Sequence, residues 1–200
     1  MIEIEKKFPL SPANENLLTK NAELIRTVKN TDTYFDTEDY KLTTKDWWMR
    51  IRNDSFELKI AQKDNLTEKT NIYEEVTDQT KIRELLNLPT GNNLEQDLID
   101  NGYLPFITCI TTRRKYKNGD FTIDLDHVDF DSDFTYDLAE IELTIEDPNQ
   151  CQEASDKIMA FAETHGLQTE KIRGKVIEYL HDKRPNHYKA LVQSGVIEDF

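Results

Sequence analysis

The chain is poor in cysteine, in long apolar runs and in positive charge. Only Cys109 and Cys151 are present, which is too few for a disulfide framework and gives no metal-ligand spacing. No apolar stretch approaches the ~20 residues that a membrane span requires. Charged residues begin at position 3, so no signal peptide is visible. These absences predict a cytoplasmic protein with reduced thiols.

Basic residues are outnumbered by acidic ones, 25 to 39, which gives a formal net charge of -14. This charge argues against nucleic-acid binding and against docking on anionic membranes, because both partners are themselves negatively charged. It is typical of a soluble monomer, although a single cleft can still be basic. The 200 residues, 37% of them hydrophobic, predict one domain over residues 1–200 with a substantial core.

Alternating apolar and charged residues dominate the chain up to residue 145, and helical patterns follow. The expected strands cover residues 2–8, 25–36, 47–52, 56–61, 70–77, 103–117, 120–128 and 134–145. The expected helices cover residues 12–24, 79–87, 94–101, 148–166, 175–181 and 186–193. Most strands follow one another in hairpin order. The predicted fold class is therefore α+β, an eight-stranded antiparallel β-barrel, closed or nearly closed, with peripheral helices.

Several strands carry charges at alternate positions and apolar residues between them. In the first strand Glu3, Glu5 and Lys7 share one face, about 7 Å apart. The same spacing recurs in Arg50/Arg52, Glu57/Lys59, Asp124/Asp126 and Glu140/Glu142. Taken singly, each stretch is a solvated face over a core. Taken together, they allow a barrel lined by charge, where carboxylates suit Mg²⁺ or Mn²⁺ and arginine suits phosphate oxygens.

The order of these motifs resembles the CYTH superfamily of triphosphate tunnel metalloenzymes. Residues 3–7, Glu-Ile-Glu-Lys-Lys, match its ExExK signature. Further matching segments follow at 32–37, 48–52, 56–59, 123–126, 140–142 and 174–177, so the resemblance spans residues 2 to about 190. Within the superfamily, the tail at 175–180 with Arg184, Pro185 and Tyr188 is similar to that of animal-type thiamine triphosphatases.

The resemblance implies a Mg²⁺-dependent hydrolase that releases the terminal phosphate of thiamine triphosphate inside an eight-stranded tunnel. The implied metal ligands are Glu3, Glu5, Glu140 and Glu142, with Asp124 contributing directly or through water. The implied triphosphate contacts are Lys7, Arg50, Arg52, Arg114 and Lys175. Because Arg113 and Lys115 flank Arg114, that assignment can shift by one position. Glu75 is the implied carboxylate of the fifth strand, with Glu74 as its competitor.

The resemblance also implies that Lys59 and Tyr34 activate the attacking water. A lysine crowded by other cations should have a lowered pKa, which would make a neutral amine available as the base. The alternative is that Lys59 clamps phosphate and Tyr34 packs in the core. Trp48 shares the face of the neighbouring arginines, and it would stack on the thiazolium ring or serve as a core or rim residue. Trp47 is expected in the core.

Other functions stay open at this point. They are an inorganic tripolyphosphatase, a broader nucleoside triphosphatase, an adenylyl cyclase, and a polyphosphate-binding module without catalysis. A pure anion binder has little use for a set of interior carboxylates, which argues against the last of these. The expected partner is thiamine triphosphate or another triphosphate, with no nucleic acid and no membrane. The histidines have no ligand spacing, and we expect them at the surface or at helix ends.

Overall fold

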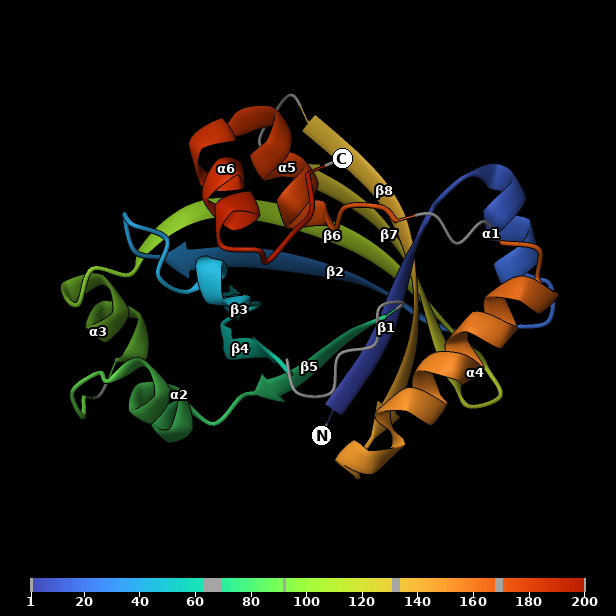
Figure 1. The fold of residues 1–200 in the computed structure, drawn as a ribbon, viewed down its shortest axis with the longest axis horizontal. Coiled ribbons are helices and arrows are strands. Elements are labelled where there is room, and N and C mark those ends of the chain that lie inside the picture. Colours follow the sequence, from blue (N-terminus) through green and yellow to red (C-terminus); the bar gives the residue numbers. More distant parts are fainter. Residues whose placement is uncertain (1, 63–69, 92, 131–133, 168–170, 200) are drawn as a thin grey trace.

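A closed antiparallel barrel forms the centre of the protein (Figure 1). The structure, a computed structural model, describes residues 2–62, 70–91, 93–130, 134–167 and 171–199. Within these residues eight strands pair in the order β1-β5-β4-β3-β2-β6-β7-β8. Their bounds are β1 Ile2–Pro9, β2 Glu23–Asp36, β3 Trp47–Arg52, β4 Ser55–Ala61, β5 Asn71–Val76, β6 Leu104–Asn118, β7 Phe121–Phe130 and β8 Phe134–Ile145. The predicted fold class is confirmed.

Helices surround the barrel at the expected places. They are α1 Pro12–Thr19, α2 Gln79–Leu86, α3 Leu94–Asp100, α4 Cys151–Thr164, α5 Lys175–Lys183 and α6 Pro185–Gln193, with the short 3₁₀ turns η1 Thr43–Lys45 and η3 Pro148–Gln150. The first helix ends before the expected Leu24, because Glu23 and Leu24 pair with β6 and already belong to β2. Among the described helices, none is both long and apolar enough to cross a membrane.

Short turns set the register of the two hairpins. The β3–β4 turn consists of Asn53 and Asp54, whose φ angles are 46° and 67°. Positive φ at both positions is the backbone of a type I′ turn, which matches the twist of the flanking strands. The β6–β7 turn consists of Gly119 and Asp120, one residue later than the expected Asn118 start. These registers decide which side chains point into the barrel.

The apolar faces of the strands point outward and lie under helices. Ile4 of β1 and Ile141 of β8 are fully buried in a cluster with Ile158 of α4. On the opposite side, Leu58 of β4 packs in a second cluster with Ile82 of α2. Burying such a side chain contributes roughly 1.5–3 kcal/mol. The helices therefore supply the apolar cover that leaves the charged faces inside.

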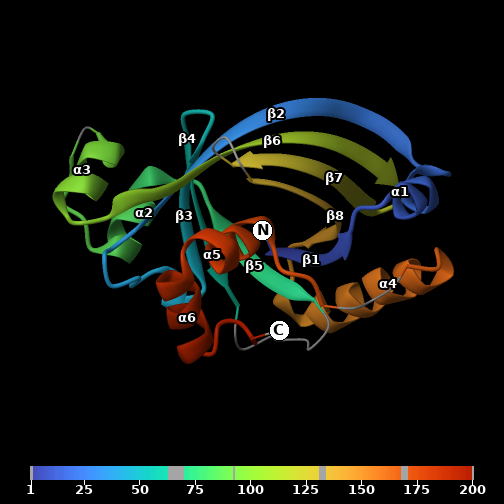
Figure 2. The same cartoon turned by 90° about the horizontal axis from the view of Figure 1, so that it is seen from above.

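One end of the barrel interior is filled by the C-terminal helices. Val176 and Leu180 of α5 pack against Val128, Phe130 and other side chains on the inner face of the sheet. Figure 2 shows α5 and α6 on the concave side of the arch made by β2, β6, β7 and β8. This apolar filling closes part of the interior and leaves the charged part open.

His187 lies in the first turn of α6, in keeping with the expectation of the surface or a helix end, but it is not at the surface. Its side chain is buried, and its Nε2 lies 2.7 Å from the Oγ1 atom of Thr43. The contact ties α6 to η1, the turn that leads into β3.

Candidate active site

A charged cavity of about 990 Å³ occupies the open part of the barrel. Nearly all of the predicted site residues line it. They are Glu3, Glu5, Lys7, Tyr34, Trp48, Arg50, Arg52, Lys59, Glu75, Glu140, Glu142 and Lys175. Asp124 is fully buried at its wall and accepts a hydrogen bond from Lys115, which lines the cavity, at 2.8 Å. Glu75 faces the cavity, whereas its competitor Glu74 is exposed.

Arg114 is the predicted site residue that the structure places elsewhere. Its guanidinium donates to the carboxylate of Glu15 in α1 at 2.5 and 3.0 Å, and 37% of its side chain is exposed. Its neighbours Arg113 and Lys115 line the cavity instead, because successive residues of a strand point to opposite faces. The cavity-lining positions are therefore those on either side of Arg114, the shift by one position that the sequence left open.

Carboxylates gather at one wall of the cavity in two groups that share Glu142. One group adds Glu3 and Glu5, the other adds Asp124 and Glu140, and the ligand oxygens within each group lie within 4.8 Å of one another. Burial and the negative charges of Glu3 and Asp124 raise the pKa of Glu142 well above its ordinary value. Burial also raises the pKa of Asp124, and its Oδ1 atom has no hydrogen-bond partner among the described residues. Crowded carboxylates with a spare buried oxygen fit a hard divalent cation.

Arg113 compensates much of this negative charge. Its guanidinium donates to Asp126 through two hydrogen bonds of 2.7 Å, to Glu140 at 2.9 Å, and to Asp124. The surrounding carboxylates outweigh burial and raise its pKa further. Asp126, which is buried behind the cavity lining, thereby fixes the orientation of the guanidinium. The sequence signal for the role of Asp126 was its place in the alternating pattern with Asp124.

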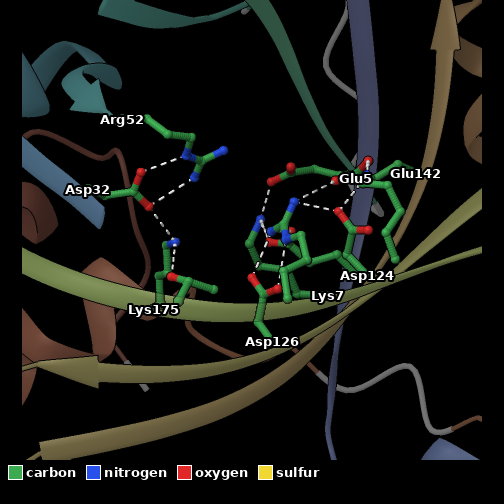
Figure 3. A network of polar contacts seen from close by, with 12 residues as sticks. Glu5, Lys7, Asp32, Arg52, Asp124, Asp126, Glu142 and Lys175 are labelled. Atoms are coloured by element: carbon green, nitrogen blue, oxygen red, sulfur yellow. Dashed lines mark hydrogen bonds and ion pairs between the residues drawn. The ribbon is translucent and has the colours of Figure 1, made fainter. Parts of the chain in front are cut away.

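Asp32 holds a second group of cations, which Figure 3 shows apart from the carboxylate cluster. It accepts two hydrogen bonds from Arg52, at 2.6 and 2.9 Å, and one from Lys175 at 3.0 Å. Although Asp32 is fully buried, these cations hold its pKa below its ordinary value. Asp32 was not among the predicted site residues. Its place two residues before Tyr34 on the same strand face was the available signal.

Lys59 lies among carboxylates, and this overturns the expectation for its pKa. Its Nζ is 2.5 Å from Glu3, 3.1 Å from Glu75 and 3.6 Å from Glu5. Burial alone would lower the pKa of Lys59, but the attraction of Glu5 and Glu3 raises it well above its ordinary value. The expectation of a neutral amine was wrong for this state, because the nearest charges are negative.

Tyr34 belongs to a different set of contacts. Its hydroxyl accepts a hydrogen bond from Arg50 at 3.2 Å, and Arg50 also pairs with Glu57. In the described contacts Tyr34 and Lys59 share no hydrogen bond, although both line the cavity. The Nζ of Lys59 instead lies 5.5 Å from the centroid of the Tyr73 ring.

The two tryptophans lie on opposite sides of β3, as predicted. Trp48 lines the cavity, and its Nε1 donates to Asp46 at 2.7 Å. Trp47 packs against the apolar cluster beneath α2 and α3. The cavity therefore has an aromatic end beside its charged part.

Comparison with known protein families decides the class of the chain. The CYTH domain matches residues 1–174. The chain belongs to the CYTH family. Thiamine-triphosphatase from Homo sapiens is 28% identical over 207 residues, which cover 96% of this chain and 90% of that protein. Thiamine-triphosphatase from Macaca fascicularis is 27% identical with the same coverage.

Solved structures share the CYTH fold at lower identity. The PH1819 protein from Pyrococcus horikoshii OT3 is 23% identical with a TM-score of 0.63, covering 91% of this chain and 99% of that one. The HpAC1 protein from Hippeastrum, described as having a dominant triphosphatase activity, is 18% identical with a TM-score of 0.52. That alignment covers 90% of this chain and 95% of that one. At these identities the likeness concerns the fold alone.

Proposed function

We propose that the protein is a divalent-metal-dependent phosphohydrolase that converts thiamine triphosphate to thiamine diphosphate and phosphate. Membership of the CYTH family and the likeness to thiamine-triphosphatases over 96% of the chain support this class. The observation that carries the proposal is the joint lining of one cavity by a carboxylate cluster and by a set of arginines and lysines. A metal–triphosphate complex needs both kinds of side chain.

The buried charges that line the cavity are paired with one another, and these pairs hold the cations in place for a substrate. Phosphate oxygens would accept from Lys7, Arg50, Arg52, Arg113 and Lys175, while Asp32 and Asp126 keep the cations that they orient. Glu3, Glu5, Asp124, Glu140 and Glu142 would hold Mg²⁺ or Mn²⁺, which supplies Lewis-acid neutralisation of phosphate charge. The barrel holds these charges in place before substrate arrives, so the site requires little further reorganisation.

In the proposed reaction, water attacks the terminal phosphorus and the bond to the leaving diphosphate breaks. Catalysis of such a transfer is mostly positioning and stabilisation of negative charge. Lys59 and Tyr34 stay the candidates for contact with the attacking water, and the raised pKa of Lys59 favours a charged ammonium. If Lys59 acts as a charged ammonium, K59R should keep more activity than K59M. If Lys59 were a general base, both variants would lose that base.

Trp48 is the proposed contact for the organic end of the substrate. Its indole would face the positively charged thiazolium ring, a cation–π contact worth about 1–2 kcal/mol. Inorganic tripolyphosphate has no such group, so W48A should lower kcat/KM for thiamine triphosphate by about tenfold and spare tripolyphosphate. Equal losses on both substrates would contradict this placement.

The deciding experiment measures phosphate release from thiamine triphosphate, tripolyphosphate and ATP, each with Mg²⁺ and with EDTA. We expect the fastest phosphate release from thiamine triphosphate with Mg²⁺, and we expect EDTA to abolish that release. A preference for tripolyphosphate would favour the second candidate, an inorganic tripolyphosphatase, which the abundance of interior cations supports. Release of pyrophosphate and cyclic AMP from ATP would indicate a cyclase. Absence of turnover with all substrates would favour a polyphosphate-binding module.

A further inference from the structure

Asp46 joins η1 to β3 at the aromatic end of the cavity, and its backbone is fixed on both sides. Its φ and ψ angles are 61° and 40°, a left-handed conformation that aspartate and asparagine adopt more readily than most residues. Its N–H donates to the carbonyl of Thr43 at 3.0 Å, and its carbonyl accepts from the N–H of Ala61 at 3.2 Å. The fold therefore determines where this carboxylate lies.

The carboxylate of Asp46 contacts two aromatic side chains that line the same cavity. Its Oδ1 accepts from the Nε1 of Trp48 at 2.7 Å and from the hydroxyl of Tyr73 at 3.3 Å. All three residues line the cavity. A hydrogen bond from an indole N–H to a carboxylate fixes the plane of the ring and polarises it toward greater electron density on its face.

We propose that Asp46 is a specificity-determining residue that selects triphosphates whose organic group carries a positive charge. The inference rests on the proposed function, because it concerns the organic end of the same substrate. A negative charge behind the indole strengthens the attraction of its face for a cation. It also attracts the cation directly, in a cavity where charges are weakly screened.

The substitution D46N separates charge from structure at this position. Asparagine keeps the left-handed backbone, and its amide oxygen still accepts from Trp48, but the negative charge is lost. D54N is the matched control, because Asp54 also has positive φ, at 67°, and is exposed in the β3–β4 turn. We expect D46N to lower kcat/KM for thiamine triphosphate about tenfold more than for tripolyphosphate, mainly through KM. D54N should change neither.

Equal losses on both substrates would assign Asp46 a purely structural role and overturn the inference. An unchanged ratio of the two activities in D46N would overturn it as well. When the wild-type protein prefers thiamine triphosphate and D46N prefers it by the same factor, the inference fails while the proposed function stands.

A binding measurement tests the inference independently of catalysis. In a W47F background Trp48 is the remaining tryptophan, so its fluorescence reports on the aromatic end of the cavity. Titration with thiamine, which carries the cation without phosphates, should give a Kd about tenfold weaker in D46N than in its parent. Adenosine, which is neutral, should bind both proteins alike.

Thiamine that fails to quench Trp48 in the parent, or that quenches it equally in D46N, overturns the inference. Quenching that depends on Asp46 in a protein that does not hydrolyse thiamine triphosphate supports the inference and refutes the proposed function.

Discussion

Replacing His187 by phenylalanine should reduce the loss of stability that the protein undergoes on acidification. The imidazole is 3% exposed and stacks on the ring of Tyr40, with 4.0 Å between the ring centroids. Its Nε2 lies 2.7 Å from the Oγ1 of Thr43. Phenylalanine keeps an aromatic ring in this place and removes both the titration and the hydrogen bond.

The magnitude follows from the pKa of the buried imidazole. Burial lowers the pKa of His187 to about 4, with Arg184 acting in the same direction and Asp36 against it, from an ordinary value of 6.5. Below pH 6.5 the unfolded chain therefore takes up a proton that the folded protein does not bind. The contribution to stability is complete above pH 6.5 and is lost as the pH falls toward 4. Between pH 7.5 and 5.0 the loss amounts to about 2 kcal/mol.

Urea unfolding of both proteins at pH 7.5, 6.5, 5.5 and 5.0 measures this difference. At pH 7.5 H187F should be less stable by about 1–3 kcal/mol, because the buried Thr43 hydroxyl loses its partner. At pH 5.0 that gap should narrow by about 2 kcal/mol. The interior carboxylates titrate in both proteins and cancel in the comparison. A gap that stays constant over this pH range would refute the reasoning.

Other substitutions separate the roles of the interior charges. R113M should reduce kcat/KM by at least about 100-fold, since several buried carboxylates lose their cation. R114M should keep activity within about threefold and lower the free energy of unfolding by about 0.2–1 kcal/mol. Equal effects of the two substitutions in steady-state assays would contradict the strand faces assigned to Arg113 and Arg114. D32N should raise KM by about 10-fold or more, because the two cations it orients are released; an unchanged KM would count against that positioning role. Mg²⁺ should raise the Tm of the wild-type protein, because it binds the folded state. That rise should be absent in E142Q, and scanning calorimetry with Mg²⁺ or EDTA would show whether it persists.

Much of the fold followed from local patterns, because alternation along a strand reports directly which faces are apolar. The end of α1 did not follow, since the assignment of Glu23 and Leu24 to β2 depends on pairing with β6, more distant in the chain. The hairpin turns were predicted to within about one residue. Strand pairing decides such boundaries, and the pairing of distant strands cannot be inferred from a single sequence.

The site shows the same division between local and distant information. Parity along β1, β3 and β8 predicted which side chains of these strands line the cavity. Because three consecutive residues of β6 are basic, alternation of charge does not show which of them point into the barrel. The pairing of Arg113 with Asp126 and of Arg114 with Leu125 decides this. The pKa of Lys59 depends on Glu3, which belongs to another strand. The monomeric state and cytoplasmic location stay predictions.

The pairing of β1 with β8 has a consequence for how the protein acquires activity. Glu5 lies opposite Glu142 in that pair, and Lys175 reaches the same cavity from α5 beyond the last strand. Contacts between such distant segments require loop closure before they stabilise the chain, and this slows folding. During synthesis, a ribosome-bound chain that has not yet released α5 would lack a complete set of phosphate contacts. Catalytic competence would therefore arise late and abruptly, only after the segments from β1 to α5 have all emerged.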